Sequence, residues 1–184
     1  MSKVCIFMAD GVEEVEALTP VDLLRRAGIG IDMVSIMGRD EITGSHKIVI
    51  RTDKRIEDMD ADEYDGLICP GGLKGTQNLK ADERVLDLCK KFNKEGKLTA
   101  AICAAPTVLG AAGILEGKRA TCYPGCEDGL TGATKLTDRV VVDGTIITSR
   151  GMGTAVDFGL SIVEYFTDKA SADELAKKVV YREA

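Results

Sequence analysis

Histidine and tryptophan are the scarcest residue types in this chain of 184 residues, which has one histidine, His46, and no tryptophan. A single histidine excludes a histidine-rich metal site within one chain, because such a site draws several imidazoles from the same protein. It also makes any Ser-His-Asp or Cys-His triad depend on His46 alone. His46 is distant in sequence from every loop considered below. We therefore expect it on the surface rather than acting as a catalytic base, and we expect no metal site.

Clustered positive charge and long apolar runs are also missing. The chain has 24 Lys and Arg against 30 Asp and Glu, a net charge of −6, which makes it a poor nucleic-acid binder. No apolar run approaches the roughly 18–20 residues needed to span a bilayer, and the opening residues lack a signal-peptide pattern. Six cysteines are too sparse for a disulfide scaffold. We expect a cytoplasmic protein with reduced cysteines that binds neither nucleic acid nor membrane.

Short apolar runs alternate along the chain with segments of helical periodicity. This alternation predicts an α/β fold in which helices cover both faces of a mostly parallel sheet. Residues 1–184 are expected to form one domain, because no linker or internal repeat divides them. Strands are predicted at 4–8, 31–36, 47–51, 66–69, 98–102 and 119–122, and as a hairpin at 140–142 and 145–148. Helices are predicted at 12–27, 82–92, 106–112, 154–165 and 172–180.

Cys103 is the main candidate for a reactive side chain. Ligands of open α/β sheets bind beyond the carboxyl ends of the strands, and Cys103 stands where the apolar run 98–102 turns into a helix beginning near Pro106. Its neighbours are alanines, and a tight elbow that presents a nucleophile needs such small residues. Because a helix N-terminus stabilises a thiolate, we expect a lowered thiol pKa. The alternative is a core cysteine, a frequent role of free cysteine.

Gly72 and Ala104 are candidates for an oxyanion hole. Gly72 ends the Pro70-Gly71-Gly72 segment that follows the run 66–69. Glycine lets the backbone approach a ligand and direct its N–H toward developing negative charge, and the N–H of Ala104 would be the second donor. The alternative is an ordinary strand-to-helix turn.

Glu16 is the candidate partner of Cys103. It belongs to an acidic cluster with Glu13 and Glu14, which follows the first strand. Acidic residues in a first helical turn usually serve the helix dipole from a solvated face, and Glu13 fits that description. Glu16 lies about one turn deeper. If its carboxyl points toward the sheet edge, a nearby thiolate would raise its pKa, so that it could donate a hydrogen bond to Cys103 and relay protons.

The remaining cysteines carry weaker signals. Cys5 and Cys69 lie in predicted strands and Cys89 lies on an apolar helical stripe, so all three are expected in the core. Cys122 and Cys126 are not spaced as the C-x-x-C of a redox or zinc pair. They either line the site or have a structural role.

Five motifs, taken in order, resemble those of the DJ-1/ThiJ/PfpI superfamily, and more closely its DJ-1-like branch, which includes the bacterial YajL proteins. The resemblance runs from about residue 3 to 180 and rests on residues 11–16, 20–28, 70–72, 100–106 and 148–154. It implies a flavodoxin-like three-layer sandwich with a nucleophile elbow at Cys103. It also implies Glu16 as the protonated carboxyl partner and the amides of Gly72 and Ala104 as the oxyanion hole. A homodimer is implied as well, and we expect the helix around residues 14–26 in its interface.

Two departures from the family pattern bear on the chemistry. The protease-like PfpI branch carries a histidine directly after the nucleophile, whereas this chain has Ala104, which argues against peptidase chemistry. Some DJ-1 members place a histidine before the proline that matches Pro124. This chain has Tyr123 there, so a base-assisting histidine is absent, and Tyr123 could instead donate a hydrogen bond to a substrate oxygen.

Two functions fit the same environment of Cys103. The resemblance implies a cofactor-independent glyoxalase or deglycase-type enzyme that acts on methylglyoxal, glyoxal or their early adducts and so protects against carbonyl stress. The alternative is an oxidative-stress sensor or redox-regulated chaperone that uses Cys103 without turnover.

Overall fold

Seven strands form the central sheet of the computed structural model, which describes residues 2–181. In spatial order they are β10 (Val140–Asp143), β11 (Ile146–Ser149), β7 (Leu98–Ile102), β6 (Gly66–Cys69), β1 (Lys3–Met8), β2 (Gly30–Ser35) and β5 (Lys54–Arg55). Neighbouring strands are parallel except β10, which pairs antiparallel with β11 at one edge. The predicted mostly parallel α/β sheet is confirmed.

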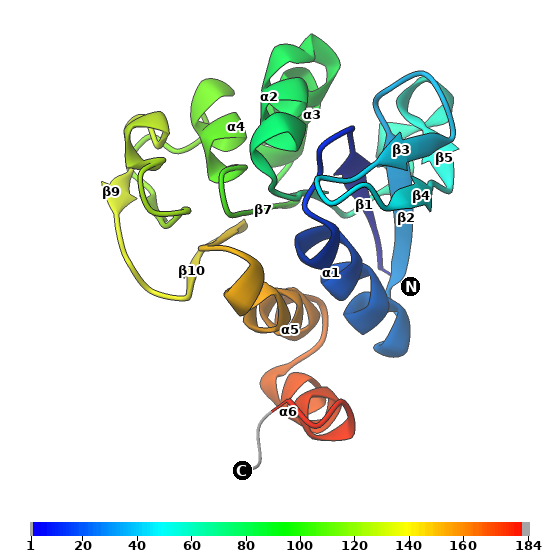
Figure 1. The fold of residues 1–184 in the computed structure, drawn as a ribbon. Coiled ribbons are helices and arrows are strands. Elements are labelled where there is room, and N and C mark those ends of the chain that lie inside the picture. The colour runs from blue at the N-terminus through cyan, green and yellow to red at the C-terminus, as the bar shows by residue number, and fades with distance from the viewer. Residues whose placement is uncertain (1, 182–184) are drawn as a thin grey trace.

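Helices cover both faces of this sheet (Figure 1). On one face lie α1 (Glu14–Arg26) and α5 (Ala155–Phe166), with α6 (Lys169–Lys178) packed against α5; on the other lie α2 (Leu73–Ala81), α3 (Glu83–Lys94) and α4 (Pro106–Ala111). Within residues 2–181, no helix combines the length and apolar character needed to cross a membrane.

The sequence of β1 is apolar throughout because both of its faces are covered. Its side chains alternate between two cores: Val4 and Ile6 pack on the side of α1 and α5, whereas Cys5 and Phe7 pack on the side of α3 and α4. Successive side chains of a strand point to opposite faces of a sheet, so a strand buried on both sides shows no alternation of polarity.

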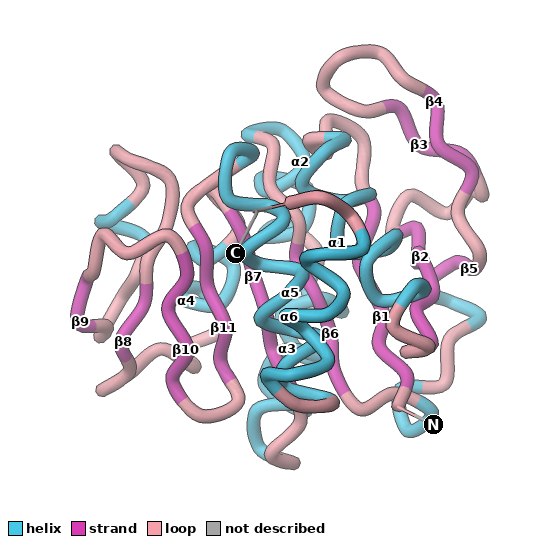
Figure 2. The backbone as a smooth tube through the Cα atoms, turned by 90° about the horizontal axis from the view of Figure 1, so that it is seen from below, coloured by secondary structure: helices cyan, strands magenta, loops and turns pink. Residues whose placement is uncertain are grey.

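Two small sheets flank the central one. Strands β3 (Glu41–Thr43) and β4 (Val49–Arg51) form an antiparallel hairpin that projects beyond the central sheet (Figure 2). Strands β8 (Arg119–Ala120) and β9 (Thr134–Lys135) form a short parallel pair. The described part of the chain also contains four 3₁₀ turns, at Ile56–Asp58, Ala61–Glu63, Glu127–Gly129 and Met152–Thr154.

Several predicted boundaries differ from the structure. The segment 119–122 pairs for two residues only, outside the central sheet. Beyond Ala120, the N–H of Thr121 donates to the side-chain hydroxyl of Thr148 in β11 instead of to a backbone carbonyl. In the segment 47–51 the strand begins at Val49, since Lys47 has a φ of 65° in the hairpin turn. The helix predicted from residue 12 begins two residues later, after Glu13 as its N-cap.

The last helix begins earlier than predicted, and some elements have no predicted counterpart. Helix α6 starts at Lys169 because the side chain of Asp168 caps it by accepting the N–H of Ser171. The elements without a predicted counterpart are β3, β5, β9 and α2. Helix α2 starts without a capping side chain and contains a glycine, which weakens its helical signal.

The carboxyl ends of β11, β7, β6 and β1 lie side by side. The chain order reverses at β1, because β2 and β6 pair on its opposite sides. Such a reversal is where ligands of open α/β sheets bind. Gly72, Cys103 and Ala104 follow β6 and β7 directly, and Glu16 lies in the first turn of α1, the helix after β1.

Candidate active site

Cys103 occupies a sharp turn between β7 and α4. Its φ is 65°, a left-handed conformation that few residues other than glycine adopt. Two backbone hydrogen bonds hold it there: its N–H donates to the Ser149 carbonyl at 2.9 Å, and its carbonyl accepts the Tyr123 N–H at 2.7 Å. The neighbouring residue Ala104 is buried. The strand–turn–helix elbow predicted from the small residues around Cys103 is present.

The carboxyl group of Glu16 lies beside Cys103. Glu16 is 1% exposed, and its Oε2 is buried without a hydrogen-bond partner among the described residues. Burial raises the pKa of Glu16 to about 7, and the charge of Glu13 acts in the same direction. The Cys103 thiol and the backbone N–H of Met152 are near enough to oppose this shift in part.

The thiol pKa of Cys103 is raised to about 12, first by burial and then by the charge of Glu16 and a hydrogen bond with it. The N–H groups of Gly72 and Ala104 face the sulfur and oppose this shift, but they do not outweigh burial next to a carboxyl group. The lowered pKa expected from a helix N-terminus is therefore wrong. Helix α4 has only six residues, and burial is the largest cause of the shift in the thiol pKa.

Two consecutive glycines bring the backbone into the site. A Cβ added to Gly71 would overlap Glu16 Oε2 and lie 2.5 Å from the Cβ of Cys103. A Cβ added to Gly72 would overlap the Gly11 carbonyl oxygen, and the φ of 87° at Gly72 also favours glycine. Sequence reasoning selected Gly72 for its N–H and missed Gly71, whose missing side chain leaves the space where Glu16 meets Cys103.

The loop after β11 closes another side of the site. A Cβ placed on Gly151 would lie 3.3 Å from Tyr123 Cδ2 and 3.7 Å from Glu16 Oε1, so this loop, the Tyr123 ring and the Glu16 carboxyl are neighbours. Thr154 Oγ1 fixes the loop by accepting the Gly151 N–H at 3.1 Å and by sharing a hydrogen bond with the Ser149 hydroxyl at 2.7 Å. Sequence reasoning used this loop as a motif and missed its contact with Glu16.

His46 is exposed, as expected, but it is not remote from the site. The hairpin of β3 and β4 brings its Nδ1 to 2.8 Å from Glu14 Oε2 and 4.0 Å from Glu13 Oε1. Within residues 2–181, Glu13, Glu14 and His46 form a group of possible metal ligands, because their potential ligand atoms all lie within 4.8 Å of one another. Because Glu14 and His46 already pair with each other, we assign no ion to the group.

The six cysteines are all free thiols. Cys5, Cys69 and Cys89 are fully buried, as expected for core residues. Cys122 is also buried, and burial raises its pKa to about 11. Cys126 is half-buried, like Cys103, so these two thiols are the ones open to solvent.

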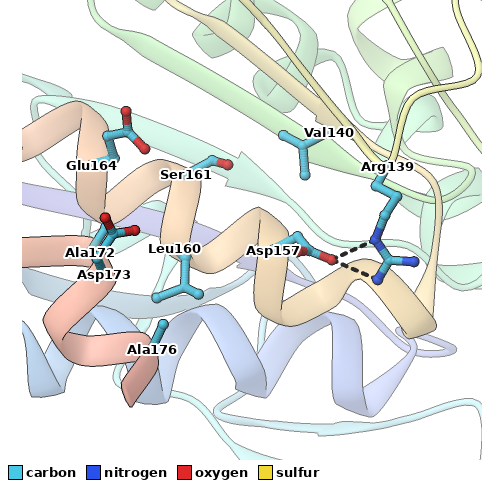
Figure 3. A pocket seen from close by; sticks show the side chains of 9 residues that line it. All are labelled: Arg139, Val140, Asp157, Leu160, Ser161, Glu164, Ala172, Asp173 and Ala176. Atoms are coloured by element: carbon cyan, nitrogen blue, oxygen red, sulfur yellow. Dashed lines mark hydrogen bonds and ion pairs between the residues drawn. The ribbon is translucent and has the colours of Figure 1, made fainter. Parts of the chain in front are cut away.

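A separate pocket of about 240 Å³ lies beside α5 and α6 (Figure 3). Arg139 donates two hydrogen bonds to Asp157 at its rim, and neither Cys103 nor Glu16 lines it. Arg139 also donates to the Gly153 carbonyl at 2.8 Å. Arg139, at the rim of this pocket, therefore helps to hold the loop after β11 in place.

Comparisons with known proteins show the family to which the chain belongs. The model of the DJ-1/PfpI family matches residues 2–165. The chain is 38% identical over 182 residues to DJ-1 homolog B of Arabidopsis thaliana; the match covers 98% of this chain and 42% of that protein, so the chain spans less than half its length. A Pyrococcus abyssi protein named deglycase is 36% identical over 153 residues, covering 82% of this chain and 91% of that protein. The crystal structure of Drosophila melanogaster DJ-1beta matches with a TM-score of 0.93 and 37% identity over 98% of each chain. The chain belongs to the DJ-1/PfpI family.

Proposed function

We propose that the chain is a cysteine-dependent enzyme with glyoxalase- or deglycase-type chemistry, acting on methylglyoxal, glyoxal or their early adducts. The observation that carries the proposal is the pairing of Cys103, held at an elbow, with a buried Glu16 whose pKa of about 7 suits proton transfer near neutral pH. The Pyrococcus abyssi relative named deglycase supports the deglycase part of this proposal.

The first step is addition of the Cys103 sulfur to the aldehyde carbon of methylglyoxal. As the C–S bond forms, the thiol proton passes to the Glu16 carboxylate and the carbonyl electron pair moves to oxygen. The N–H groups of Gly72 and Ala104, which face the sulfur, would donate to this oxyanion. Protonation of the oxyanion by Glu16 gives a hemithioacetal and restores the carboxylate.

The second step moves a proton between the two carbons. The Glu16 carboxylate takes the proton from the carbon bonded to sulfur, which gives an enediolate, and returns it to the neighbouring carbon. The hydroxyl proton moves from the oxygen on the carbon bonded to sulfur to the oxygen on the neighbouring carbon, so that the first oxygen becomes the thioester carbonyl. The product is a lactoyl thioester of Cys103. Water then cleaves the C–S bond, releasing lactate and the thiol. The net reaction adds one water to methylglyoxal without an external oxidant or reductant.

Lactate formation from methylglyoxal tests the proposal. Cys103→Ala should abolish it, and Glu16→Gln should lower kcat by about 10²–10⁴-fold, the contribution typical of a general acid–base group. Cys126→Ala is the matched control, because Cys126 is the other half-buried thiol, and it should keep wild-type turnover. If Cys103→Ala still converts methylglyoxal to lactate at the wild-type rate, the proposal is wrong.

A redox role is the second candidate, favoured by the partial exposure of Cys103. Peroxide oxidises thiolates that solvent reaches. The raised pKa of the Cys103 thiol slows that reaction unless Glu16 accepts the proton. Turnover with assistance from Glu16 therefore fits the geometry better than unaided sensing.

We propose that the chain forms a homodimer whose interface includes the exposed apolar face of α1. Val15 and Leu18 of α1 are 43% and 36% exposed, and Ile48 and Val49 of the hairpin are 52% and 61% exposed. A groove of about 600 Å³ joins part of this surface, and contiguous exposed apolar surface of this kind marks association sites. Sedimentation should give twice the mass of 19.7 kDa, and Leu18→Glu should give the monomer. A monomeric wild-type chain would refute this.

A further inference from the structure

The tip of the β3–β4 hairpin is fastened to the loop that precedes α1. The N–H of Gly11 donates to the Thr43 carbonyl at 2.7 Å, and the N–H of Ser45 donates to the Val12 carbonyl at 2.8 Å. The side chain of Asp10 accepts the Thr43 N–H at 2.9 Å. These bonds place the hairpin tip against the segment from which α1 and its Glu16 begin.

Glu14 is the buried residue of α1 to which the hairpin tip is hydrogen-bonded. It is 4% exposed, and its carboxylate accepts the N–H of His46 at 2.7 Å, the Nδ1 of His46 at 2.8 Å and the hydroxyl of Ser45 at 3.1 Å. All three donors come from the hairpin tip. Among the described residues, His46 is the cationic partner recorded for Glu14, and it is the sole histidine of the chain.

Glu13 connects this attachment to the active site. Its Oε2 accepts the N–H of Glu16 at 2.7 Å, which caps α1. Its own N–H donates to the Gly71 carbonyl at 3.0 Å, and its Oε1 lies 4.0 Å from His46 Nδ1. The Glu13 carboxylate therefore lies between the imidazole and the first turn that carries Glu16.

We propose that His46 is a positioning residue for the Glu16–Cys103 pair: docked on Glu14, it fixes the first turn of α1, and its positive charge offsets those of Glu13 and Glu14 and so favours the carboxylate form of Glu16. The turnover arm of the test rests on the proposed function, whereas the chemical and spectroscopic arms do not.

The charged groups around His46 and around Glu16 determine whether the charge of His46 raises or lowers the pKa of Glu16. From α1 and its cap, Glu14 and Glu13 face His46, and the hydrogen bond with Glu14 raises the pKa of His46 above 6.5. From its own hairpin, Ser45 and the exposed neighbour Lys47 flank it. Below its pKa, His46 carries the charge. Above that pKa, neutral His46 can still donate from Nδ1 to Glu14, so the charge is lost while the contact remains.

Glu16 faces Cys103, the charge of Glu13 and the N–H groups of Gly71 and Met152. Because Glu13 raises the pKa of Glu16, a cation beside Glu13 lowers it, and loss of that cation raises it again.

Three substitutions separate charge from contact. His46→Asn keeps a donor near the position of Nδ1 and removes the charge, His46→Ala removes both, and Lys47→Gln removes one charge from the same hairpin tip as the matched control. The rate of Cys103 alkylation by iodoacetamide is measured against pH for each, because it reports ionisation of the pair without any substrate. Conversion of methylglyoxal is measured in parallel.

The midpoint of the alkylation profile should move upward by about 0.5 pH unit in His46→Asn, the order expected for removal of one nearby charge in a solvent-exposed setting. Lys47→Gln should leave it unchanged, and His46→Ala should also lower the plateau rate. A His46→Asn profile that coincides with wild type would overturn the proposal. Wild-type protein that shows the alkylation profile and its shift in His46→Asn but converts no methylglyoxal would refute the proposed function and still support the role of His46.

The electrostatic interaction between His46 and Glu16 acts equally on both groups, which allows a second measurement that is independent of alkylation. If the charge of His46 lowers the pKa of Glu16, the charge of Glu16 must raise the pKa of His46 by the same amount. The sole imidazole is directly visible by NMR, so its titration in wild type and in Glu16→Gln can be compared. A lower His46 pKa in Glu16→Gln supports the proposal, and an unchanged one overturns it.

Discussion

Gly71→Ala is the substitution that most directly tests the proposed cooperation of Glu16 and Cys103. The φ of Gly71 lies outside the left-handed region, so alanine fits its backbone. The new Cβ would overlap Glu16 Oε2 and stand 2.5 Å from the Cβ of Cys103. An ordinary non-bonded contact needs roughly 3.5 Å, so each of the two side chains must withdraw from the new Cβ by about 1 Å or more. Misplacement of that size costs a reaction about 10²-fold in rate.

Steady-state kinetics with methylglyoxal should therefore show a fall of about 10²-fold in kcat/KM for Gly71→Ala. Overpacking of this kind typically lowers stability by about 1–3 kcal/mol, so the protein should stay folded, which circular dichroism and thermal unfolding will show. Gly153→Ala is the matched control, since a Cβ there meets open space in the same group of site loops. A folded Gly71→Ala protein with wild-type kcat/KM would refute the view that Gly71 leaves the space in which Glu16 approaches Cys103.

Three further outcomes follow from burial and ionisation. The kcat/KM should rise as pH increases through about 7, because the Glu16 carboxylate must be present to accept the thiol proton; a flat profile in this range contradicts that role. The pKa of Glu14 is lowered to about 2 from 4.5, so its stabilising effect should be complete above pH 4.5 and be lost as pH falls toward 2; Glu14→Gln should flatten this dependence in thermal melts. Mild peroxide should modify Cys103 and Cys126 before the four buried cysteines, and peptide mass spectrometry that found equal modification of all six would argue against it.

The central sheet could be predicted from sequence because its strands are short apolar runs ended by glycine, proline or polar residues. The run ending at Met8 and the run ending at Cys69 illustrate this, since covering both faces leaves the strand uniformly apolar. Strands β3 and β5 could not be predicted in the same way. They have three and two residues, too few to show any periodicity, and their pairing depends on tertiary contacts.

The site was predictable where the signal is local and was missed where it is long-range. The elbow at Cys103 follows from small residues on either side of it. The raised pKa of its thiol depends on burial and on Glu16, which lies 87 positions earlier in the chain. The contact of His46 with Glu14 likewise joins segments 32 residues apart, and the sequence carries no signal that connects them.

The left-handed backbone at Cys103 has a consequence for the stability of this chain. A residue with a Cβ in that conformation costs roughly 1–2 kcal/mol relative to a relaxed backbone, whereas glycine adopts it freely. A Cys103→Gly chain would be free of this backbone strain but would lose the packing of the half-buried thiol. At φ 65° the chain therefore presents a side chain where the backbone alone favours glycine, so measuring the stability of Cys103→Gly shows how backbone strain and thiol packing balance at the elbow.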